Sequence, residues 1–111
     1  MTHPQPGLEE DDLFLMANLS PARTGLPFVV WISPRGNAQH DIRVKVSRGP
    51  AAHNFVTVAL RPLRVIGGEL SAQDLELLRR WVELNWDVLR GYWDGSIQYT
   101  EDAIAQLRSI A

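Results

Sequence analysis

Apolar and polar residues alternate with a period of two over residues 41–47 and 55–61, and the apolar stretch over residues 28–33 is also predicted to be a strand. The segment over residues 41–47 separates branched apolar residues from polar ones, with Ile42, Val44 and Val46 opposite Asp41, Arg43, Lys45 and Ser47. This period is typical of β-strands with one buried face and one face in water. A fourth, shorter strand is predicted over residues 63–66, and the short connections favour an antiparallel meander.

A period close to 3.6 residues begins at Ser71 and predicts one long amphipathic helix as far as about Asp94. Ser71 is the expected N-cap, and Asp74 completes a variant of the capping box. The apolar residues of this helix cover an arc of about 200°, whereas docking on one surface requires a stripe of about 100°. We therefore expect either the last helix or a second protomer to cover the surplus.

The remaining segments are an N-terminal tail, a loop before the first strand and a short helix at the C-terminal end. Residues 1–12 are rich in proline, glycine and acid and are predicted to be a disordered acidic tail. Residues 18–27 have the composition of a loop, and Thr100 is the expected cap of a short helix. The predicted fold class of residues 13–111 is therefore α+β, a single domain with a three- or four-stranded antiparallel β-meander packed on one long amphipathic helix, plus a short C-terminal helix.

The formal net charge of −2 conceals an uneven distribution of charge. Residues 20–66 carry a charge of +6, whereas residues 1–19 and residues 67–111 each carry −4. A basic centre between acidic ends fits either an anion-binding surface or neutralisation of one segment by the others. The candidate residues for binding an anion or nucleic acid are Arg35, His40, Arg43, Lys45, Arg48 and Arg61.

Composition excludes several classes of protein. The chain has no cysteine, which excludes disulfides, cysteine-ligated metals and thiol catalysis. No apolar run reaches the roughly 18 residues of a membrane span, and no metal-binding or phosphate-binding motif occurs. We expect a cytoplasmic protein with no cofactor, no metal and no membrane contact.

His40 is the one weak candidate for catalysis. It follows the turn at residues 34–37 and precedes the basic strand. Beside Arg35, Arg43 and Lys45, an imidazole could move a proton while the cations hold a phosphate, as metal-independent cleavage of a phosphodiester requires. The alternative interpretation is a loop histidine that faces solvent.

Three residues of the long helix are weak candidates for an interface. Trp86 lies at the edge of the apolar arc, Trp93 lies within it, and Asn85 lies near its centre. A buried amide needs hydrogen-bond partners, so Asn85 is expected to bond to the backbone of a strand or loop, to pair across a dimer axis or to contact a ligand. Trp31 would be a stacking platform for single-stranded nucleic acid if its ring is exposed.

The segment from residue 37 to residue 94 also resembles a small bacterial family, domain of unknown function 4160. The resemblance is carried by Gly68-Glu69-Leu70, Trp81-Val82-Glu83-Leu84 and Leu89-Arg90-Gly91-Tyr92-Trp93. Asn37-Ala38-Gln39-His40-Asp41-Ile42 matches the start of that family's strand in part, because His40 keeps the first histidine and Ile42 replaces the second. The resemblance implies a small intracellular α+β module with a protein partner, in an arrangement like that of toxin–antitoxin pairs.

Two functional hypotheses follow from these patterns. The first is a non-enzymatic interaction module that self-associates or binds a partner protein. The second is a nucleic-acid-binding protein or a metal-independent ribonuclease that uses the basic strand region. The second hypothesis requires the basic side chains to form a continuous face, whereas the first expects Glu and Asp to pair with them.

Overall fold

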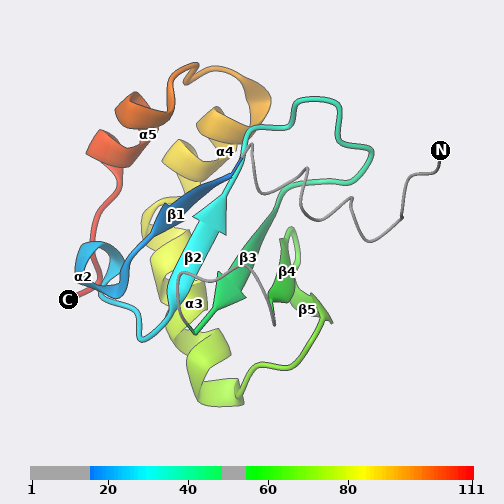
Figure 1. Ribbon diagram of the computed structural model, residues 1–111, viewed down its shortest axis with the longest axis vertical. Helices are drawn as coiled ribbons and strands as arrows, with labels where there is room; N and C mark the ends of the chain where they lie inside the picture. Colours follow the sequence, from blue (N-terminus) through cyan, green and yellow to red (C-terminus); the bar gives the residue numbers. More distant parts are fainter. Residues whose placement is uncertain (1–15, 49–54) are drawn as a thin grey trace, which may run out of the picture.

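The residues that the structure describes form a five-stranded antiparallel sheet covered by helices (Figure 1). The computed structural model describes residues 16–48 and 55–111, so the predicted tail over residues 1–12 lies outside the described residues. The strands follow each other across the sheet in chain order, as β1 (Ala17–Leu19), β2 (Val29–Ile32), β3 (Arg43–Ser47), β4 (Val56–Leu60) and β5 (Leu63–Gly67). The α+β class and the antiparallel order are confirmed, but the sheet has five strands rather than three or four.

The additional strand, β1, begins at Ala17, the end of an apolar run over residues 13–17 whose pattern fits either a strand or a turn of helix. It continues into residues 18–27, which are predicted to be a loop. Its three residues pair with β2, with Ala17 opposite Ile32 and Leu19 opposite Val30. The Pro-rich connection that follows contains the short helix α2 (Pro21–Thr24), which ends at Gly25 in the left-handed conformation. Three residues are too few to show a period of two in the sequence. The strand forms because it pairs with β2, and its own sequence pattern does not predict it.

The predicted long helix is divided at Asn85 into α3 (Ala72–Leu84) and α4 (Trp86–Asp94). Asn85 has φ −112° and ψ 17°, and its side-chain amide donates to the carbonyl of Trp81 one turn earlier. Side-chain bonds of this kind compete with the regular helical pattern. The N-cap at Ser71 is confirmed, because its hydroxyl accepts from the backbone N–H of Asp74.

The short C-terminal helix is confirmed as α5 (Thr100–Gln106), but its N-cap is Tyr99 rather than Thr100. The Thr100 hydroxyl instead pairs with the Tyr92 hydroxyl at 2.7 Å, which connects α5 to α4. Ala103 of α5 is fully buried, and Ile104 packs against the core. The last helix therefore covers part of the wide apolar arc of α3 and α4, as one of the two expectations has it.

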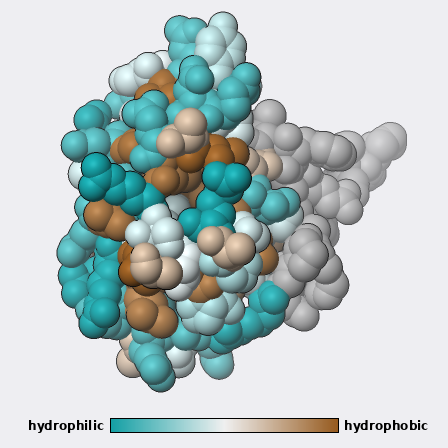
Figure 2. Space-filling view, turned by 90° about the vertical axis from the view of Figure 1, so that its left-hand side faces the viewer, coloured by the Kyte–Doolittle hydropathy of each residue, from teal (hydrophilic) through white to brown (hydrophobic). Residues whose placement is uncertain are grey.

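The core lies between the helices and one face of the sheet. Strand residues of one parity, such as Val30, Val44 and Val58, are buried against Leu78 and Trp81 of α3. On the face that carries α2 and α5, hydrophobic side chains reach the surface in separate patches among hydrophilic ones (Figure 2). No helix in the described part of the chain is long and apolar enough to cross a membrane.

The opposite face of the sheet was expected to lie in water, but three of its side chains are buried. Trp31, Lys45 and Ser47 are all buried there. The Trp31 indole N–H donates to the Ser47 hydroxyl at 3.0 Å, and the Phe55 ring meets Trp31 edge-on. Because Trp31 is only 6% exposed, it is not the open stacking platform that an exposed tryptophan would provide.

Candidate functional site

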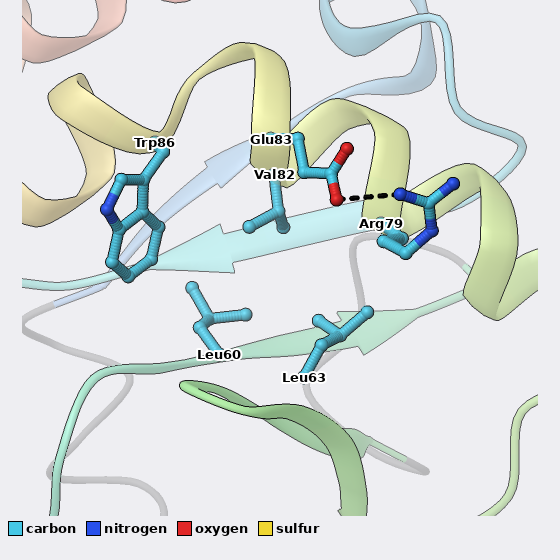
Figure 3. A pocket seen from close by; sticks show the side chains of 6 residues that line it. All are labelled: Leu60, Leu63, Arg79, Val82, Glu83 and Trp86. Atoms are coloured by element: carbon cyan, nitrogen blue, oxygen red, sulfur yellow. Dashed lines mark hydrogen bonds and ion pairs between the residues drawn. The ribbon is translucent and has the colours of Figure 1, made fainter.

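An open apolar groove of about 450 Å³ lies between the β4–β5 hairpin and the helices (Figure 3). Leu60 ends β4 and Leu63 begins β5, so the tight hairpin turn places both side chains at the same end of the sheet. They point toward Val82 of α3 and Trp86 of α4, which form the opposite wall. Arg79 and Glu83 complete the lining.

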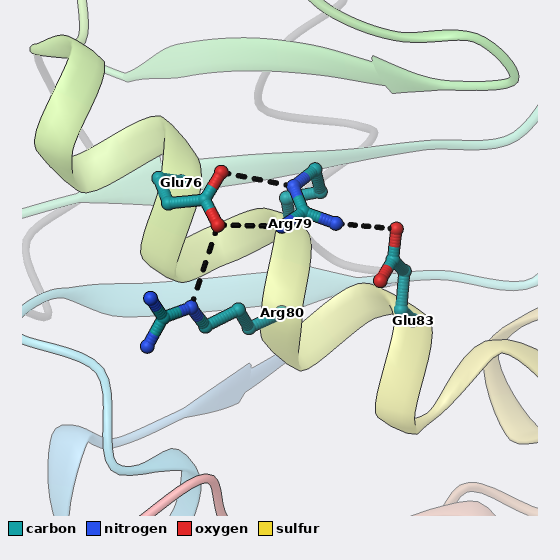
Figure 4. A network of polar contacts seen from close by, with 4 residues as sticks. All are labelled: Glu76, Arg79, Arg80 and Glu83. Atoms are coloured by element: carbon teal, nitrogen blue, oxygen red, sulfur yellow. Dashed lines mark hydrogen bonds and ion pairs between the residues drawn. The ribbon is translucent and has the colours of Figure 1, made fainter.

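The rim of the groove on α3 is a network of charged side chains (Figure 4). Arg79 lies between two acids, with donors to both oxygens of Glu76 and a 2.6 Å bond to Glu83, while Arg80 also reaches Glu76 at 3.4 Å. The hydrogen bonds from Arg79 lower the pKa of Glu76 to about 2. The charges on this rim are therefore largely satisfied within the protein.

Arg61, a predicted anion-binding residue, lies at the turn that closes the groove. Its guanidinium makes two 2.8 Å bonds to the carboxylate of Asp41 and lies 5.9 Å from the centre of the Trp86 ring. These bonds lower the pKa of Asp41 to about 2. Arg61 thus supports the indole that forms the groove wall.

His40, the weak catalytic candidate, lies beside Trp93 with their ring centres 5.5 Å apart. Its Nδ1 is 2.8 Å from the backbone oxygen of Asp41. Because a carbonyl oxygen can only accept, Nδ1 carries the proton in this contact. Arg35 lies at the same end of the sheet, where its backbone N–H donates to the carbonyl of Trp93. These contacts describe an exposed loop histidine packed on the end of α4.

The remaining basic candidates are dispersed. Arg48 pairs with Asp74 at the start of α3 at 2.7 Å, and Lys45 is buried with its ammonium 5.8 Å from the Phe55 ring centre. Arg43 is half-buried in β3, in the register row that contains Ala59 and Arg64. Arg61, Arg48 and Lys45 thus occupy three separate environments.

Asn85 is buried and bonds to backbone, as the first of its three interpretations expects. Its amide donates to the carbonyl of Arg108 at 2.9 Å and accepts from the N–H of Arg108 at 2.7 Å. The amide therefore attaches the segment after α5 to the junction of α3 and α4. Of the two tryptophans, Trp93 is buried and Trp86 is half-buried, so Trp86 is the one available at a surface.

Sequence reasoning did not identify the groove residues other than Trp86. Leu60 and Leu63 flank the Arg61-Pro62 turn, and Arg79 and Trp86 are seven residues apart at one edge of the polar sector of the helix. Both spacings are visible in the sequence. Whether the hairpin residues and the helix residues meet in space, however, depends on how the helix crosses the sheet, and neither spacing specifies that.

No group of three His, Asp or Glu side chains within the described ranges is arranged to hold a metal ion. In comparisons with known proteins, no family model, no curated protein and no solved structure matches the sequence significantly. The resemblance to domain of unknown function 4160 therefore stays a prediction, carried only by the motifs in the sequence.

Proposed function

We propose that this chain is a non-enzymatic interaction module, which acts in the cytoplasm and binds an apolar part of a partner protein in the groove. The observation that carries the proposal is the groove itself, with apolar walls and the half-buried Trp86 at its edge. Tryptophan is enriched among the residues that dominate binding energy at protein interfaces. The volume of about 450 Å³ lies in the range of pockets that enclose a ligand.

The ion pairs favour this function over nucleic-acid binding. Arg61 and Arg48 are held by Asp41 and Asp74, and the arginines of α3 are held by glutamates. A phosphate would have to displace these carboxylates, which already satisfy the geometry of a guanidinium. For Arg48 and Arg61 of the basic segment, this pairing is what the interaction hypothesis expects.

Hydrolysis of a phosphodiester also lacks support at His40. The ring donates from Nδ1 to a carbonyl and lies against Trp93, and the neighbouring cation Arg61 is engaged with Asp41. General acid–base catalysis would need a second positioned group to stabilise the charged phosphate. The motif resemblance, which implies a protein partner in a toxin–antitoxin-like arrangement, is consistent with the interaction proposal.

The test is a comparison of the proteins that bind to three forms of the full chain. Wild type, Trp86→Ala and the control Tyr99→Ala are immobilised and exposed to host lysate, and the retained proteins and RNA are quantified. Tyr99 is 62% exposed and outside the groove, so it is a matched aromatic control. Any retained protein is then purified and titrated against each form by calorimetry.

We expect a protein whose affinity for Trp86→Ala falls at least tenfold while its affinity for Tyr99→Ala is unchanged, since truncated hot-spot residues cost 2 kcal/mol or more. Circular dichroism establishes that both variants are folded. Equal binding to all three forms, or retention of RNA that weakens steeply with salt, would exclude the proposal.

A further inference from the structure

β5 is an edge strand of the sheet. It pairs with β4 on one side, and no strand pairs with its other side within the described residues. In an antiparallel strand, alternate residues direct their N–H and C=O groups toward opposite sides. Part of the β5 backbone is therefore available to an added strand.

The groove reaches this edge at Leu63, the first residue of β5. Leu63 belongs both to the groove wall and to β5, and it is only half-buried, as is Val65 on the same face. Their neighbours on β4, Leu60 and Val58, are buried. The apolar face is thus less buried at β5 than at β4. One more strand beside β5 would continue the sheet, cover Leu63 and Val65, and border the groove at Leu63.

Arg64 lies on the opposite face of β5 and is exposed. It is in register with Ala59 of β4, which is in register with Arg43 of β3, so one row of the sheet contains two arginines. Unlike Arg48 and Arg61, Arg64 forms no ion pair with any described residue. Opposite charges on directly paired strand residues attract each other, so a residue opposite Arg64 on an added strand is best an acid.

We propose that β5 binds an extended segment of the partner protein by strand addition. Apolar side chains of the segment face the groove, and an acidic residue between them faces Arg64. In this mode of recognition the main-chain bonds supply affinity and the pocket supplies specificity. The inference rests on the proposed function and names the chemistry of the partner.

Two features of β5 restrict the occupant. The register with β4 shifts between Thr57 and Val58, opposite Ile66, so the regular part of the edge is short. A second copy of β5 is a poor occupant, because the strand Leu63–Gly67 has no acid to offer Arg64. The segment is therefore a short one from another protein.

The test uses fluorescein-labelled peptides with alternating leucine and glutamate, and a second set with lysine in place of glutamate. Fluorescence anisotropy measures their binding to the full chain, to Arg64→Glu and to Arg23→Glu. Arg23 is an exposed arginine on α2, so its reversal changes the net charge equally at a distant site. Peptides with alanine in place of leucine, or with N-methylated backbone amides, test the groove and the strand pairing.

Wild type and Arg23→Glu should bind the glutamate peptide more tightly than the lysine peptide, by roughly two- to fivefold. Arg64→Glu should reverse this preference, which a purely structural effect of the substitution would not do. The alanine and N-methylated peptides should lose most of the binding. Strand addition would be overturned if Arg64→Glu kept the wild-type preference for the glutamate peptide, or if the N-methylated peptide bound as tightly as the unmodified one. It would also be overturned by a dimer of the chain in sedimentation that Arg64→Glu abolishes.

The two proposals fail differently. If no peptide binds but a partner is still lost from Trp86→Ala, strand addition is wrong and the groove remains the binding site. If neither the peptides nor any partner depends on the groove, both proposals are wrong.

Discussion

Single residues fix how the parts of this protein meet, and Asn85 is the clearest example. It was expected to need hydrogen-bond partners because it interrupts an apolar arc, and its amide indeed bonds to the backbone of Trp81 and Arg108. Its partner in the segment after α5 was not predictable, because a helical pattern does not show which distant backbone an amide meets. Similarly, Lys45 occupies a position that alternation assigns to water, yet it is buried, with its ammonium 5.8 Å from the centre of the Phe55 ring.

Replacing Asn85 with alanine should destabilise the fold by about 1–3 kcal/mol, since it leaves the N–H and C=O of Arg108 without their partner. Asn85→Asp should also destabilise, because a carboxylate cannot donate to the two carbonyls. Urea unfolding measures both changes. Gln73→Ala, at an exposed position in the first turn of α3, is the control and should change the free energy of unfolding by less than about 0.5 kcal/mol. Equal stability of Asn85→Ala and wild type would contradict this role.

Acid should weaken the fold through Asp41 and Glu76. The hydrogen bonds from Arg61 and Arg79 lower the pKa of each carboxyl to about 2, from ordinary values of 3.8 and 4.5. A carboxyl whose pKa is lowered by folding stabilises the protein above its ordinary pKa and loses that contribution as pH falls toward the lower value.

The free energy of unfolding should therefore decrease from about pH 4.5 to pH 2. The decrease should be smaller in the double variant Asp41→Asn, Glu76→Gln, although exposure of both groups keeps the difference small. Urea unfolding at pH 6 and pH 3 measures this. An identical decrease in wild type and the double variant would show that these pairs do not contribute.

At the scale of elements, the sequence predicted four strands, and their ends agree within two residues with those of β2, β3, β4 and β5. It missed β1 and α2, which are too short to carry a period. It joined α3 and α4, because the apolar pattern continues through Asn85 while the backbone does not. The groove was likewise not predictable, since it lies where the β4–β5 hairpin faces the end of α3 and the start of α4.

The end of α2 is packed against the last residues of the described chain, which allows a matched pair of substitutions. Gly25 and Gly95 both end helices with positive φ, at 82° and 92°. A Cβ on Gly25 would lie 2.7 Å from the backbone nitrogen of Ala111, whereas one on Gly95 would meet nothing within 4 Å. Gly95→Ala thus measures the backbone strain alone, about 1–2 kcal/mol.

Gly25→Ala should destabilise the protein by more than Gly95→Ala does. It should also accelerate exchange of the Ile110 amide, which donates to the carbonyl of Thr24 at 2.9 Å. Chemical denaturation and hydrogen exchange measure the two effects. Equal losses of stability, with no change at Ile110, would mean that the segment after α5 adapts without cost.

At the scale of the whole molecule, Arg48, Arg61 and the arginines of α3 and α4 form ion pairs. The β4–β5 region combines an open groove with a sheet edge that no described strand pairs. The basic centre of the chain is a count along the sequence, and such a count does not show which arginines meet acids in the fold. Arg48 and Arg61 are neutralised by acids that are distant in the sequence, and no count along the chain shows such pairing.

Hydrogen exchange of the backbone amides in the presence of the leucine–glutamate peptide tests the central claim most directly. β1 is the opposite edge of the same sheet and serves as the internal control. The account predicts that the peptide slows exchange along β5 and leaves β1 unchanged. Slower exchange at β1, or a bound peptide that protects no amide of β5, would contradict it.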